Sequence, residues 1–128
     1  MTAGGAGPGP ALLAAGARRA LQPSAGWGAA WPRAAAFLAR QALEDAVRGV
    51  WHGAVASMRD ANMTAKLVSL PFYLEDPELA RRVRQCWAAL SNGCHAHPYE
   101  LAPTLSELEG WLEVVDELVV AVTASAPP

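Results

Sequence analysis

Apolar residues recur along most of the chain at intervals of three and four, the spacing that gathers them on one face of an α-helix. After Trp31-Pro32 this face consists of Ala36, Leu43, Val47, Val50, Trp51 and Ala54. After Asp76 it consists of Leu79, Val83, Cys86, Trp87, Leu90 and Cys94, and after Thr104 of Leu105, Leu108, Leu112, Val115, Val119 and Val122. Strand-like alternation and hairpin turns do not occur in the sequence. We therefore predict an all-α fold, an antiparallel helical bundle of four to five helices.

The ends of the longer helices carry recognisable signals. Pro32 and Pro77 suit the first position of a helix, where a missing N–H removes no needed hydrogen bond. Asp76 precedes Pro77 as an N-cap, and Thr104 with Glu107 three residues later forms a capping box. These signals predict helix starts near 32, 77 and 105.

Shorter elements and the domain limits follow from Gly, Pro and Asn. Residues 11–21 predict a short Ala-rich helix, and Asn62 or Asp60 caps another that runs to Leu70 and is stopped by Pro71. Residues 1–10, with four Gly and two Pro, predict a disordered lead. We expect a single bundle domain over 11–124 and a flexible tail over 125–128.

The composition narrows the classes of partner. The chain is 52% hydrophobic and 17% charged, which favours either a generous core or an apolar surface covered by another subunit. A net charge of -2 predicts no DNA binding and no attraction to acidic membranes. No apolar run is long enough to span a bilayer, and no basic segment precedes the apolar stretch near the N-terminus, so we expect a cytoplasmic protein.

The residues that could bind a metal do not form a convincing set. Cys86 and Cys94 lie on an apolar helix face, where we expect them to act as small buried hydrophobes. His95 and His97 supply two ligands, but no further ligand stands at a suitable spacing. We predict no metal site and no cofactor.

Several residues are candidates for an interface with a second subunit. Trp27 and Trp31 precede a helix start and can anchor an interface if exposed. Gly49 and Gly53 lie one turn apart and leave a flat strip for a neighbouring helix. The last helix is apolar over more than one face, so we add two of its residues, Trp111 and Leu118. For Trp51, Trp87 and Trp111 a core position is the default.

The richest polar cluster follows the helix that ends near Cys94. We predict Asn92, His95, His97 and Tyr99 as its binding residues, with His95 and His97 as candidates for catalysis and no catalytic residue assigned. A structural alternative stays open, in which a histidine caps the carbonyls at the helix end and Tyr99 packs the turn onto the core.

Two segments resemble the HEPN family (higher eukaryotes and prokaryotes nucleotide-binding). The segment 39–44, with Arg40 and Glu44, resembles the Arg-x-x-x-Glu opening of HEPN bundles, and 87–98 resembles a signature in which a helix ends in Leu-Arg-Asn before a histidine. The resemblance spans about residues 33–122. It implies a helical homodimer, and in ribonuclease members the arginine and histidine act together across the dimer interface. Here Ser91 replaces that arginine and cannot hold a phosphate by permanent charge.

We therefore expect a HEPN-like binding or regulatory module that acts through a homodimer or another protein, in a defence or toxin–antitoxin setting. RNA or a nucleotide is a further candidate ligand. One alternative is a metal-independent ribonuclease that uses His95 or His97 at a dimer seam. Another is a structural subunit of a larger assembly.

Overall fold

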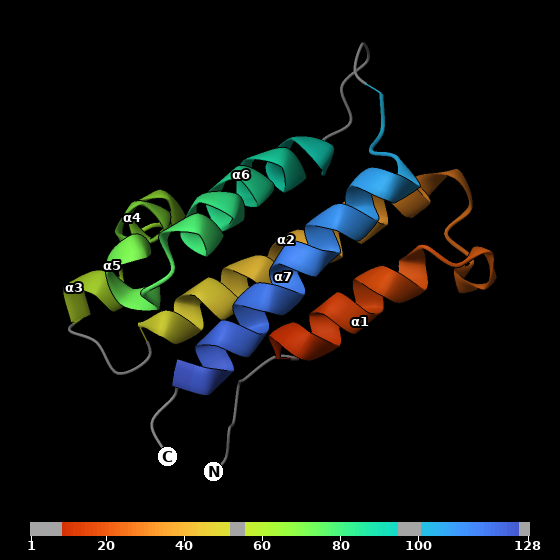
Figure 1. Cartoon of the computed structure of the whole chain (residues 1–128). Helices are drawn as coiled ribbons and strands as arrows, with labels where there is room; N and C mark the ends of the chain where they lie inside the picture. The colour runs from red at the N-terminus through yellow and green to blue at the C-terminus, as the bar shows by residue number, and fades with distance from the viewer. Residues whose placement is uncertain (1–8, 52–55, 95–100, 126–128) are drawn as a thin grey trace.

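The computed structural model describes residues 9–51, 56–94 and 101–125, and four long helices dominate them (Figure 1). These are α1 (Pro10–Ala20), α2 (Trp31–Val50), α6 (Pro77–Gly93) and α7 (Leu105–Ser125). The shorter elements are η1 (Pro23–Ala25), η2 (Gly28–Ala30), α3 (Ala56–Arg59), α4 (Met63–Ser69) and α5 (Pro71–Leu74). The described residues contain no strand, which confirms the predicted all-α bundle.

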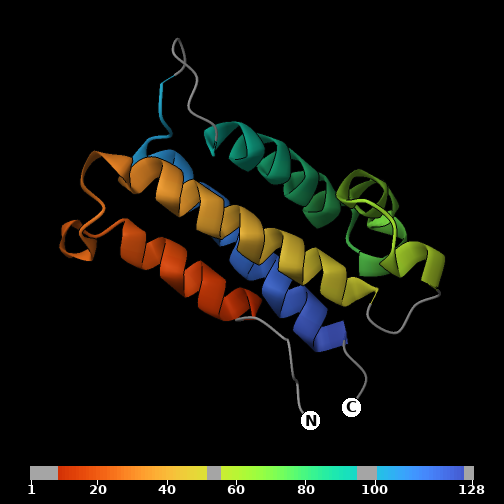
Figure 2. The same ribbon diagram turned by 180° about the vertical axis from the view of Figure 1, so that it is seen from behind.

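Helices α2 and α7 lie side by side and form the centre of the bundle. Figure 1 and Figure 2 show α1 on one side of this pair and α6 on the other, and both outer helices contact both central ones. Successive long helices run antiparallel, so α2 and α7 run in the same direction. The largest fully buried side chains include Leu43, Val47, Leu90, Leu108, Leu112 and Leu118.

The contact of α1 with its neighbours is built from small side chains. Ala14, Ala17 and Ala20 of α1 are buried, as are Ala35, Ala36, Ala39, Ala42 and Ala46 of α2. Small side chains at a helix contact permit short interaxial distances. They also fill little space, so the larger side chains of α1 are left at the edges of the contact.

The predicted helix starts near 77 and 105 are confirmed by capping hydrogen bonds, whereas α2 begins at Trp31 without a side-chain cap. The Asp76 carboxylate accepts from the Leu79 N–H at 3.0 Å. The Thr104 hydroxyl accepts from the Glu107 N–H at 3.1 Å, while the Glu107 carboxylate accepts from the Thr104 N–H at 3.0 Å. The carbonyl oxygen of the Asn62 side chain accepts from Ala65 at 2.8 Å, which selects Asn62 over Asp60 as the cap.

Some boundaries differ from the prediction. Pro71 follows the end of α4 but also begins α5, because proline is compatible with a first helical turn. Helix α3 was not predicted. Helix α1 begins at Pro10, inside the predicted lead. Residues 1–8 of that lead and residues 126–128 of the tail lie outside the described residues. None of the described helices is both long and apolar enough to cross a membrane.

Candidate protein-binding groove

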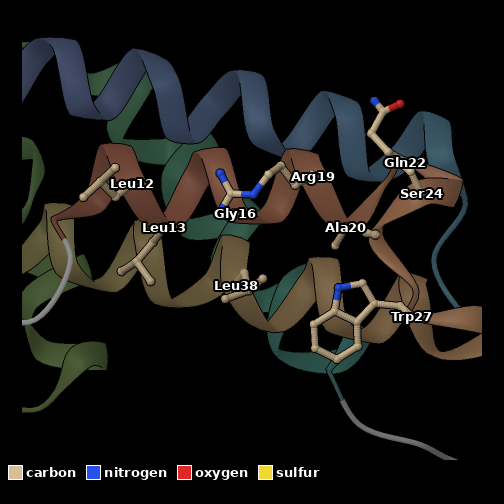
Figure 3. Close-up of a pocket in the computed structure, with 10 residues that line it drawn as sticks. Leu12, Leu13, Gly16, Arg19, Ala20, Gln22, Ser24, Trp27 and Leu38 are labelled. Atoms are coloured by element: carbon tan, nitrogen blue, oxygen red, sulfur yellow. The ribbon is translucent and has the colours of Figure 1, made fainter.

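A groove of about 680 Å³ runs along α1 where it meets the first half of α2. Figure 3 shows Leu12 and Leu13 at one end, Leu38 near the middle and Trp27 towards the other end. Leu12 is 66% exposed and Trp27 49% exposed. Apolar side chains of this size exposed along one groove are typical of a surface that another molecule covers.

The sequence of α1 explains why leucines line this groove. Leu12 and Leu13 are adjacent and therefore point about 100° apart around the helix. Ala14, Ala17 and Ala20 already occupy the buried face, so Leu13 is only half-buried and Leu12 points away from the core. The groove is thus a consequence of an alanine-lined helix contact with leucines along its edge.

Trp27 is held between two glycines in the loop that joins α1 to α2. Gly26 and Gly28 have φ angles of 81° and 57°, in the left-handed region that favours glycine. Trp27 also lines a second cavity of about 330 Å³, together with Trp31 and Leu105. One indole ring therefore forms part of the wall of two neighbouring apolar cavities.

Charge within the groove is sparse. Arg18 makes an ion pair with Asp116 of α7 at 2.6 Å, and this pair links α1 to α7 on the side of α1 away from the groove. Its neighbour Arg19 lines the groove, as Figure 3 shows, and no described residue gives it a hydrogen bond or an ion pair. Arg19 is the only ionisable group among the lining residues.

A second polar arrangement joins α2 to α6. The carboxylate of Glu44 is largely buried and accepts from Arg40 Nε at 3.1 Å and from Trp87 Nε1 at 2.8 Å. Arg48 lies 3.7 Å from the same carboxylate. Arg40, Glu44 and Arg48 pair as their spacing of one helical turn favours, and the indole of Trp87 is a further partner from another helix, which this spacing does not indicate. This network fastens two helices together.

The cysteines beside these helices are poor nucleophiles. Burial raises the pKa of Cys86 to about 12. Burial also raises the pKa of Cys94 above its ordinary value, although the nearby Arg40 guanidinium opposes the shift. Because the thiolate is the reactive form, both thiols are suited to packing.

The predicted polar site at the end of α6 is only partly described. Asn92 is exposed and lines a cavity of about 370 Å³ with Glu107 and Trp111, whereas His95, His97 and Tyr99 lie outside the described residues. Glu107 already serves as a cap. Ser91, which stands where the HEPN signature has arginine, has a buried hydroxyl without a hydrogen-bond partner in the described part of the chain.

The other predicted interface residues occupy different surroundings. A Cβ on Gly49 would lie 3.3 Å from Val122 Cγ1, so Gly49 faces α7 of its own chain, and Gly53 lies outside the described residues. Leu118 has no exposed surface and belongs to the core of the single chain. Trp111 and Trp31 are half-buried against that core. The wide apolar face of α7 is thus covered within the chain, because α7 contacts three neighbouring helices.

Within the described ranges, no three His, Cys, Asp or Glu side chains gather as a metal site would require.

Comparison of the chain with family models, curated proteins and solved structures found no match. The site must therefore be interpreted from its own geometry.

Sequence reasoning identified Trp27 and Trp31 but missed Leu12, Arg19 and Leu38. The adjacent pair Leu12-Leu13 was the sequence signal that could have indicated the groove. A helix on the outside of the bundle with one narrow alanine face cannot bury both leucine side chains.

Proposed function

We propose that this chain is a helical protein-binding module whose contact surface is the groove between α1 and α2. The observation that carries the proposal is the position of Trp27, half-exposed in the wall shared by two apolar cavities. Tryptophan is enriched among the residues that dominate binding energy at protein interfaces. Leu12 adds an exposed aliphatic side chain to the same surface.

The shape of the groove favours a protein over a small molecule. Pockets for small ligands usually bury most of the ligand surface. This groove instead lies open along a helix and is lined by side chains from two helices and their connecting loop. Such a surface suits an amphipathic helix that presents apolar residues at helical spacing.

Kinship with the HEPN family stays a prediction, as does the setting in defence. The ribonuclease alternative rests on the sequence alone, because both of its histidines lie outside the described residues. Incubation of the purified chain with labelled RNA in chelator tests it, since cleavage that either histidine substitution abolishes would establish a nuclease.

Site-specific photo-crosslinking tests the binding function. A benzoylphenylalanine at Leu12 is expected to give a heavier adduct, either a doubled chain or a mixed pair, in the cell that makes this protein. The matched control carries the same group at Gln85, which is exposed on α6 away from the groove. Equal crosslinking from the two positions, or none from Leu12, contradicts binding through the groove.

A further inference from the structure

One arginine side chain lies within the apolar groove between α1 and α2. Figure 3 shows the Arg19 side chain directed back along α1 towards Gly16, between the leucines at one end of the groove and Trp27 towards the other. A Cβ on Gly16 would lie 3.7 Å from Arg19 Nη2 and 3.8 Å from Leu38 Cδ1. The guanidinium therefore lies over Gly16 and near Leu38, in the middle of the groove.

This guanidinium has no counter-charge on either wall of the groove. The first 43 residues contain four arginines and no Asp or Glu, so α1 and the first half of α2 carry no carboxylate. Three of these arginines have partners elsewhere: Arg18 pairs with Asp116, Arg40 pairs with Glu44, and Arg33 donates to the carbonyl oxygen of Gly93 at 3.4 Å. Arg19 is the one of the four for which the described part of the chain provides no partner.

Covering the groove changes the surroundings of this charge. Leu12 and Trp27, which lie on either side of the guanidinium, are both exposed. A partner that buries both side chains must also cover Arg19 and remove much of its water. A buried charge without a counter-charge is costly, and the loss of water strengthens its attraction to an opposite charge. A purely apolar partner therefore fits the groove poorly, whereas a partner that brings a carboxylate fits it well.

We propose that the occupant is an α-helix of another protein that presents one Glu or Asp between two apolar residues on the same face. The inference rests on the proposed function, because it names the chemistry of the partner for the same groove. The carboxylate accepts from the Arg19 guanidinium, a group that binds carboxylates through two parallel N–H···O hydrogen bonds. The apolar residues on either side of the carboxylate contact Leu12 and Trp27.

The groove also sets the spacing expected in this partner helix. Gly16 follows Leu12 by four residues, which is about one helical turn, or about 6 Å, along α1. Residues four apart on a partner helix lie on one face at the same interval. A helix that runs along α1 with an apolar residue at i therefore places its residue i+4 at the Arg19 guanidinium. Its residue i+8 lies one turn further, towards Trp27 (Figure 3).

The probes for the test are two synthetic Ala-rich helical peptides that differ at one position. Both carry leucines at i and i+8, and the residue at i+4 is Glu in one peptide and Lys in the other. Fluorescence anisotropy of each labelled peptide, titrated with the full chain, measures its Kd. We expect wild type to bind the Glu peptide about tenfold more tightly than the Lys peptide. Arg19→Glu should reverse this preference, because it exchanges the attraction for a repulsion.

Further variants separate the charge from the apolar contact. Arg84→Glu makes the same charge change at an exposed position of α6 outside the groove, and it should leave the preference for the Glu peptide unchanged. Trp27→Ala should weaken the binding of both peptides about tenfold or more and keep the preference. Circular dichroism checks that each variant folds. If Arg19→Glu fails that check, Arg19→Gln, which only removes the charge, should abolish the preference.

Each outcome separates this inference from the proposed function. Equal affinity for the two peptides, or a preference that Arg19→Glu leaves unchanged, overturns the acidic helix as the occupant. Failure of both peptides to bind also overturns it, and the crosslink from Leu12 then decides separately whether the proposed function holds. A dimer of the chain alone that Arg19→Glu dissociates, measured by sedimentation equilibrium, assigns the groove to a second copy instead. Labelled single-stranded RNA that binds through Arg19, with neither peptide bound, assigns it to nucleic acid.

Discussion

The hydrogen bond between Trp87 and Glu44 gives a quantitative test of how α2 and α6 are held together. Trp87→Phe removes the indole N–H, which donates to the carboxylate at 2.8 Å, and keeps an aromatic ring in place. A hydrogen bond to a charged group contributes about 1.5–3 kcal/mol. Arg40 still neutralises Glu44 in the variant, so we expect the lower end of that range, about 1.5 kcal/mol.

The loss should be measured by urea denaturation, with the free energy of unfolding compared between variants. Trp111→Phe is the matched control, because it removes the same ring volume from another half-buried tryptophan whose indole nitrogen has no described partner. A double-mutant cycle with Glu44→Gln isolates the pair. A coupling energy of about 1 kcal/mol is expected, and simple additivity within about 0.3 kcal/mol would refute the reasoning.

Three further predictions concern packing, capping and pH. A Cβ on Gly93 would lie 2.9 Å from Pro103 Cγ, so Gly93→Ala should destabilise the chain by about 1–3 kcal/mol in thermal unfolding. A Cβ on Gly110 would meet open space, so Gly110→Ala should stabilise the chain by up to about 1 kcal/mol. Thr104→Ala should cost about 1 kcal/mol, since the capping box is lost; an unchanged midpoint in denaturant would contradict that role. Burial raises the pKa of Cys86 in the folded chain to about 12, so the stability that the neutral thiol contributes is complete below the unfolded pKa of about 8.5 and is lost as the pH rises towards 12. Between pH 9 and 11 the wild type should therefore lose about 1–3 kcal/mol more stability than Cys86→Ala. Parallel pH profiles for the two proteins would contradict this expectation.

Helix starts were predictable because their causes are local. Asp76 and Thr104 each cap a helix through backbone N–H groups three residues away, so the signal lies within a few residues of sequence. The same locality explains the Arg40–Glu44 pair, one helical turn apart. The contribution of Trp87 could not be predicted in this way, because it depends on the register of α6 against α2.

The groove was missed for a related reason. Alanine gives no strong periodic signal, so the pattern of α1 did not indicate which face is buried. Once Ala14 and Ala17 are known to be buried, the exposure of Leu12 follows. Leu118 was predicted at an interface with a second subunit, because the apolar face of its helix is too wide for one neighbouring helix. It is instead buried within the chain, where α7 contacts three neighbouring helices.

Amide NMR spectra recorded over a dilution series test the central claim most directly. If the chain binds through the groove, the resonances that move with concentration, or with a partner captured by crosslinking, should be those of Leu12, Gly16, Leu38 and the Trp27 indole. Residues around the cavity of Asn92 should stay unchanged. Shifts confined to the Asn92 cavity, with the Trp27 indole unmoved, would contradict the account.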